Sequence, residues 1–225
     1  DAYPFVQLHQ ASLFYGVTST ILGSGAIQQD GPERGLQERA RQSEIRAYYD
    51  DVLHRRLVGS GKVTFLGGTE YHTDGHAHLL TRKVSGETRE VRVHRRVVDA
   101  AYLAPTVPST TPPPFGVADD AAVVPVNDLA TLTSSPQRFV ILGSGKTATD
   151  AIVWLIRNDV APDRITWVRP RDTWMLNRAV VQPDPAVAIT LAADTMAAAA
   201  EAESIEDILL RLESCGAVLR VDTDV

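Results

Sequence analysis

The sequence has little of several features that would assign it to a particular class of protein. Its 225 residues include one cysteine, Cys215. That excludes an internal disulfide, leaves no redox-active cysteine pair in this stretch, and is typical of a reducing cytoplasm. No apolar run approaches the roughly 18 residues of a membrane-spanning helix, and no signal-peptide pattern opens the chain. Lys and Arg number 22 against 28 Asp and Glu, which leaves a net charge of −6. We therefore expect a cytoplasmic protein that binds neither nucleic acid nor membrane.

A P-loop of the nucleotide-hydrolysing kind is lacking too. That motif requires a glycine five positions before its second glycine. The stretch Gly145-Lys-Thr has valine at position 140, and Gly61-Lys has Arg56 at the corresponding position. A metal site is also not expected. The histidines His72, His76 and His78 lie in a predicted hairpin with Asp74-Gly75 as its loop, where His72 points away from the other two.

The stretch that is present and informative is residues 139–150, FVILGSGKTATD. Four apolar residues run into G-x-G-x-x-A and an amphipathic helical pattern follows, which predicts a strand, a glycine turn and a helix that together bind a dinucleotide. A glycine turn without a ligand is the plainer alternative. The expected pyrophosphate contacts come from Gly143, Ser144, Gly145, Lys146, Thr147 and Ala148, at a helix N-terminus that favours negative charge.

Two arginines after the next predicted strand bear on the choice of cofactor. The strand over 165–168 ends at Arg169, with Arg171 close behind and no acid at the strand tip. In NAD-binding versions an acid near this position holds the ribose 2′-hydroxyl, whereas an arginine accommodates a 2′-phosphate. The pattern therefore favours NADP(H) over NAD(H). Two solvated loop arginines are the alternative.

The rest of the chain predicts an α/β protein in two parts. Residues 135–225 are expected to form a Rossmann-like NAD(P)-binding domain, C-terminally truncated, with helices over 185–202 and from Ser204, and a strand over 217–221 that joins the parallel sheet. Residues 1–134 are expected to start with a loop, followed by a helix over 36–57 and a β-meander over 62–98. A proline-rich connector over 105–114 would leave this part.

These motifs resemble the flavin-containing monooxygenase type of two-dinucleotide flavoprotein. Residues 143–150 match its second fingerprint, G-x-G-x-S/T-A-x-D, in every fixed position. Residues 3–10 are similar to its stretch near the isoalloxazine, and residues 97–102, with the prolines that follow, are similar to the strand that closes the first FAD portion. No G-x-G-x-x-G precedes residue 143. The resemblance therefore implies that residues 1–134 are a partial FAD-binding domain whose phosphate loop lies outside this chain.

The resemblance implies an FAD- and NADPH-dependent oxidoreductase, in which NADPH reduces the flavin for oxygenation of a small organic substrate. The fragment alone is expected to be inactive, and a homo-oligomer is possible. The flavin carries the chemistry, so no catalytic residue is assigned. Two alternatives stay open: a flavin-dependent reductase without oxygenation, and a non-catalytic NAD(P)-binding module.

Overall fold

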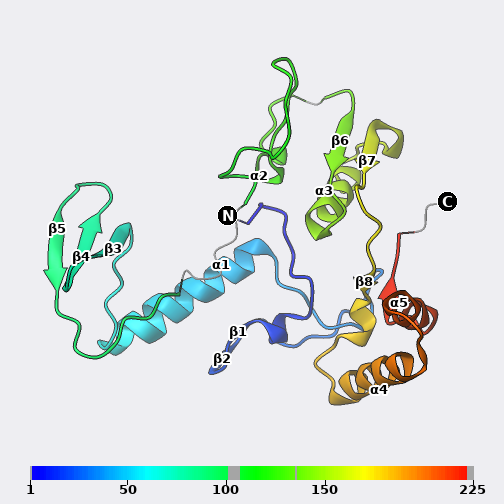
Figure 1. Ribbon diagram of the computed structural model, residues 1–225, viewed down its shortest axis with the longest axis horizontal. Helices are drawn as coiled ribbons and strands as arrows, with labels where there is room; N and C mark the ends of the chain where they lie inside the picture. The colour runs from blue at the N-terminus through cyan, green and yellow to red at the C-terminus, as the bar shows by residue number, and fades with distance from the viewer. Residues whose placement is uncertain (1, 101–106, 135, 222–225) are drawn as a thin grey trace. The chain divides into compact units, whose positions relative to one another are not determined.

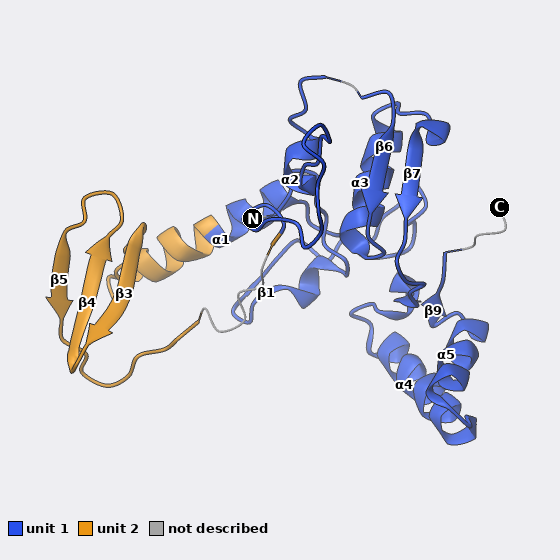
Figure 2. Cartoon of the chain, turned by 45° about the horizontal axis from the view of Figure 1, so that its top comes forward, with its two compact units in different colours: residues 1–49, 108–225 blue, residues 50–107 orange. Residues whose placement is uncertain are grey.

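The computed structural model describes residues 2–100, 107–134 and 136–221. The chain forms two compact units (Figure 2): a larger one of residues 1–49 and 108–225, and a smaller one of residues 50–107. This division follows contacts within the chain. The predicted division at residue 135 separates an expected FAD-binding part from an expected NAD(P)-binding part, and it stays a prediction. Each unit is described by itself.

The larger unit contains a parallel β-α-β arrangement at the predicted position. Strands β6 (Phe139–Leu142) and β7 (Ile165–Val168) pair in parallel, with Phe139 opposite Ile165 and Leu142 opposite Val168. Helix α3 (Lys146–Arg157) connects them, followed by a 3₁₀ turn over Pro162–Arg164, and lies beside the two strands (Figure 1). The predicted strand, glycine turn, helix and second strand are confirmed as elements. The molecule is thus a mixed α/β protein with small sheets.

A small hydrophobic core holds the helix against this sheet. Leu155 is 1% exposed and packs with Ala151 of the same helix and with Leu129. Leu129 ends the short helix α2 (Val126–Leu129). The opening segment also contributes, because the ring of Phe5 stacks on Trp154 with ring centroids 5.0 Å apart. Apolar residues spaced by three and four positions therefore give α3 one buried face, as the pattern predicted.

Residues 185–214 form two further helices of the larger unit. Helix α4 (Pro185–Glu201) and helix α5 (Ile205–Ser214) lie where they were predicted. The Ser204 side chain caps α5 by accepting a hydrogen bond of 3.1 Å from the Asp207 N–H. The Asp207 carboxylate accepts a hydrogen bond of 3.1 Å from the Glu203 N–H. In a capping box this bond would come from the N–H of the N-cap residue, Ser204, which is one residue later.

The prediction that a strand over 217–221 joins the parallel sheet is wrong. Strand β9 (Val218–Leu219) pairs antiparallel with β8 (Met175–Leu176), in a two-stranded sheet of its own. Asn177 explains why β9 pairs with β8. Its N–H donates to the Ala217 carbonyl at 2.9 Å, and its side chain donates to the Gly216 carbonyl at 2.8 Å. Side-chain and backbone bonds from a neighbouring segment thus fix β9 away from β7.

The first fifty residues are mostly irregular chain. A 3₁₀ turn (Ser12–Phe14) precedes the short antiparallel strands β1 (Gly16–Val17) and β2 (Thr20–Ile21). The predicted helix over 36–57 starts later than expected, because residues before 42 are extended and form the bridges Ile27–Gln37 and Gln7–Arg41. Helix α1 covers Gln42–Asp51, and a π-helical stretch (Val52–Leu57) and a 3₁₀ turn (Val58–Ser60) continue it.

The smaller unit contains the predicted antiparallel meander, shorter than expected. Its strands are β3 (Thr69–Asp74), β4 (Ala77–Arg82) and β5 (Thr88–Val91). Residues 62–66 and 92–98 form no strand. The predicted run over 97–103 and the connector over 105–114 extend into residues 101–106, which lie outside the described residues.

The predicted hairpin register in this meander is wrong. The loop is Gly75-His76, between Asp74 and Ala77, so that Thr73 lies opposite His78. Gly75 has a φ of +58°, which places the glycine at the first loop position, where left-handed backbone is required. His72 lies opposite Leu79, and Tyr71 reaches His78 diagonally, with 2.6 Å between the Tyr71 hydroxyl and His78 Nδ1.

Candidate functional site

The candidate site is the glycine turn at the carboxyl end of β6. The Gly143 N–H donates to the Val168 carbonyl at 3.0 Å, so the turn begins next to the end of β7. Gly143 has a φ of +133°, a backbone conformation that side chains rarely adopt, and a Cβ there would lie 3.8 Å from the Ala148 Cβ. A Cβ on Gly145 would meet nothing within 4 Å. The backbone at Gly145 therefore faces open space in which a ligand can approach.

The start of α3 supplies hydrogen-bond donors at this turn. The Ala148 and Thr149 N–H groups donate to the Gly145 carbonyl at 3.1 and 3.2 Å. The first N–H groups of any α-helix lack carbonyl partners within the helix. Those between Gly145 and Thr147 therefore lie where an anion would meet them, at the positive end of the helix dipole.

Lys146, predicted to contribute charge to a phosphate, is held by neighbours. Its ammonium pairs with the Asp150 carboxylate one turn along α3, and it lies 5.9 Å from the centroid of the Tyr3 ring. The Tyr3 hydroxyl donates to Asp150 Oδ2 at 2.6 Å. Burial and this hydrogen bond raise the pKa of Tyr3 well above its usual value. Asp150 thus joins the opening segment to the fingerprint helix.

Arg169 lies at the end of β7 and contacts the glycine turn through Trp167. The Trp167 indole N–H donates to the Gly143 carbonyl at 2.6 Å. The Arg169 guanidinium lies over this indole, with its Cζ 5.2 Å from the ring centroid. Its Nη1 is 3.3 Å from Asp172 Oδ1, and the arginine side chain is only 18% exposed. The structure therefore brings Arg169 to the turn, whereas Arg171 is exposed in the loop that follows.

Three residues of this site escaped the sequence reasoning. Tyr3 is 147 positions away from its partner Asp150, and no local pattern connects them. Trp167 occupies an alternate position of a short strand, which indicates a buried face and no particular role. The pairing of Asp172 could have been predicted from the sequence, because this acid lies only three residues after Arg169.

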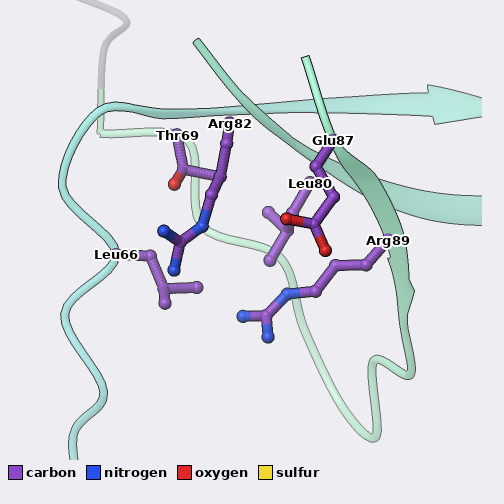
Figure 3. A pocket seen from close by; sticks show the side chains of 6 residues that line it. All are labelled: Leu66, Thr69, Leu80, Arg82, Glu87 and Arg89. Atoms are coloured by element: carbon purple, nitrogen blue, oxygen red, sulfur yellow. The ribbon is translucent and has the colours of Figure 1, made fainter. Parts of the chain in front are cut away.

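Other concave regions lie away from this turn. A groove of about 600 Å³ runs along α4 and is lined mainly by apolar side chains, among them Phe14, Val181, Leu191 and Met196. The smaller unit has a cavity of about 90 Å³, into which Arg82 and Arg89 both point (Figure 3).

Within residues 2–100, 107–134 and 136–221, no group of three His, Cys, Asp or Glu side chains could hold a metal ion. None of the helices described there is long and apolar enough to cross a membrane.

Comparison with known proteins gives relatives but no family. No family model matches the chain, and no solved structure does either. The chain is 42% identical over 227 residues to a Mycobacterium tuberculosis protein, Rv2000, and to a Mycobacterium bovis protein, Mb2023, both described only as uncharacterized. These matches cover all of this chain and 41% of each relative. The chain thus corresponds to less than half of the longer proteins it is similar to.

Proposed function

We propose that this chain is the NADP(H)-binding portion of an FAD- and NADPH-dependent oxidoreductase that resembles the flavin-containing monooxygenases. One observation carries the proposal. Two parallel strands end at the same edge, where one leads into the glycine turn and the other into Arg169. Ligands of open α/β sheets bind at the carboxyl ends of the strands. The β6-α3-β7 arrangement would then be the first half of a Rossmann-like domain.

The pyrophosphate would lie against the turn at residues 143–148. Gly145 supports this role, because the space where a side chain would project is empty and the backbone can be approached closely. The N–H groups of residues 145–147 would donate to phosphate oxygens, and the helix dipole adds a favourable charge interaction. Lys146 would contribute little net charge, since Asp150 neutralises it.

Selectivity for the 2′-phosphate would come from Arg169. The guanidinium lies over the Trp167 ring, and its planar fork suits two parallel hydrogen bonds to a phosphate. The phosphate would have to compete with Asp172 for this group. Arg171, being exposed, would add charge rather than a fixed hydrogen bond.

The contribution of this chain to FAD binding would be the opening segment. Tyr3 is fixed to Asp150 and packs on Phe5, with ring centroids 4.9 Å apart, so residues 3–10 begin beside the fingerprint helix. When bound, FAD accepts reducing equivalents from NADPH and supplies the oxygenation chemistry. The FAD phosphate loop is expected outside this chain. In this proposal the chain would hold NADP(H) and would contribute to a flavin site only through residues 3–10.

The test is a comparison of NADPH and NADH by isothermal titration calorimetry on this chain. The proposal expects tighter binding of NADPH, and an absence of binding for both nucleotides would contradict it. On the full-length protein, a yellow colour with a flavin absorbance band and NADPH-dependent oxygen uptake would support the monooxygenase assignment. A yellow protein without oxygen uptake would indicate a reductase. A colourless protein that still binds NADPH would indicate a non-catalytic binding module.

A further inference from the structure

A small cavity on the sheet of the smaller unit is lined by two arginine side chains. The cavity has a volume of about 90 Å³, and Arg82 and Arg89 both point into it (Figure 3). A cavity needs only about 10–15 Å³ to hold one water molecule, so this one has room for a small ion. Both arginines are exposed, which makes the cavity accessible from solvent.

The register of the meander brings these side chains to one face of the sheet. Arg89 of β5 lies opposite Leu80 of β4, and Arg82 follows Leu80 by two positions. Side chains two positions apart on a strand project to the same face. Thr69 of β3, which also lines the cavity, lies opposite Arg82. Three neighbouring strands thus each contribute one hydrogen-bond donor to the same cavity.

The donors of both guanidinium groups are unused. Among the residues that the structure describes, the side chains of Arg82 and Arg89 make no hydrogen bond and no ion pair. By contrast, Arg39, Arg169 and Arg211 each pair with an acid. Two positive charges therefore face one cavity, and their hydrogen-bonding groups are available to a ligand.

Glu87 also lines the cavity, and its charge opposes the binding of an anion. It lies opposite Arg82, whose N–H donates to its carbonyl at 2.9 Å. Its carboxylate is in no ion pair with either arginine of the cavity. Residues 82–96 contain six lysines and arginines against two glutamates, in a chain whose net charge is −6. The electrostatic potential at the cavity is therefore positive in spite of Glu87.

We infer that Arg82 and Arg89 bind the phosphate group of a small ligand in this cavity, with Thr69 as a third donor. A planar guanidinium donates two parallel hydrogen bonds to a phosphate. A phosphate group carries about −1.5 to −2 charges at pH 7 and has three acceptor oxygens, so it matches two arginines and a hydroxyl. A carboxylate has one charge and two oxygens, which one arginine already satisfies. The site shares no residue with the predicted nucleotide contacts and goes beyond the proposed function.

The experiment is an NMR titration of the whole isotope-labelled chain with inorganic phosphate, at pH 7 and constant ionic strength. The amide signals of residues 80–90 should shift together along one binding curve, and acetate at the same ionic strength should shift them little. Arg89→Gln should weaken phosphate binding about five- to tenfold, because a bidentate contact is lost. Glu87→Gln should strengthen it about two- to fivefold, because a repelling charge is removed.

Two further variants separate a built site from general attraction by the basic segment. Arg92→Gln is the matched control, since it removes the same charge from the same segment at an exposed residue that does not line the cavity. It should change the affinity less than about twofold, because solvent and salt screen its charge. Arg89→Lys keeps the charge and loses the planar fork, so it should weaken binding several-fold.

Three results would overturn the inference. The first is a wild-type spectrum in which residues 80–90 do not respond to phosphate, and the second is equal binding of acetate. The third is an equal loss of affinity in Arg89→Gln and Arg92→Gln, or none in Arg89→Lys. All the substituted side chains are exposed, and circular dichroism checks that each variant is folded. The signals of residues 143–148 report separately on the glycine turn, so a failure of NADP(H) to bind there would refute the proposed function alone.

Discussion

Replacing Arg169 with alanine should weaken the binding of NADPH and leave NADH almost unchanged. The two nucleotides differ only by the 2′-phosphate that Arg169 would hold. The arginine side chain is 18% exposed, so the lost interaction is a largely desolvated, charged hydrogen bond. Such bonds are worth about 1–3 kcal/mol, which corresponds to roughly a 5- to 150-fold weaker affinity for NADPH.

Asp172 provides a second measure of the same interaction. Its carboxylate is 3.3 Å from Arg169 Nη1 and is 54% exposed. An exposed ion pair contributes about 0–1 kcal/mol. Asp172→Asn should therefore free Arg169 and strengthen NADPH binding by no more than about fivefold, without an effect on NADH.

Calorimetric titration of both nucleotides on both variants checks these expectations, with circular dichroism to confirm that each variant is folded. Arg157→Ala, at the far end of α3 from the glycine turn, is the control for the loss of a positive charge. If Arg169→Ala weakens NADPH and NADH by the same factor, the arginine supports the turn or the fold, and the 2′-phosphate assignment is wrong.

Three further predictions concern stability. Leu155→Ala should lower the free energy of unfolding by about 2–5 kcal/mol, because the side chain is 1% exposed, and Leu210→Ala, at a half-exposed helical position, should lower it far less in the same urea titration. Ser204→Ala should cost about 1 kcal/mol by removing the cap of α5, and the shortened helix should show reduced amide protection in hydrogen exchange. Glu38 accepts hydrogen bonds from the Ser24 and Gly25 N–H groups, which lower its pKa. The stability that it contributes is therefore complete above its ordinary pKa near 4.5 and is lost as the pH falls through its lower folded value. Glu38→Gln should flatten the acid limb of a melting-temperature profile, and an unchanged limb would count against this role.

The elements predicted well are those whose signals are local. The strand, glycine turn and helix over 139–157 follow from an apolar run, a glycine at positive φ and an apolar stripe with a 3.6-residue period. The cap at Ser204 and the stop at Gly216, which has a φ of +77°, are local too. Each of these features is decided by side chains within one or two turns of chain.

The errors arose where distant partners decide the outcome. Residues 217–221 have the composition of a sheet strand, but hydrogen bonds from Asn177 select another neighbour. Residues 36–41 have a helical period, but bridges to Gln7 and Ile27 keep them extended. The hairpin register is a local exception: Asp74-Gly75 is also a favoured loop sequence, but the chain uses Gly75-His76, with Gly75 at the first loop position. Glu33 pairs with nearby Arg39 and with Arg178, which is far away in the sequence, and no local sequence pattern predicts the second contact.

The hydrogen bond between Tyr3 and Asp150 has a consequence for the order of folding. Strand β6, helix α3 and strand β7 lie within 30 consecutive residues, from Phe139 to Val168. Closing such a short loop is entropically easy. Tyr3 has to close a loop of 147 positions to reach the same helix. The β6-α3-β7 arrangement can therefore form early, and the opening segment, whose Phe5 packs against the same core, docks onto it later.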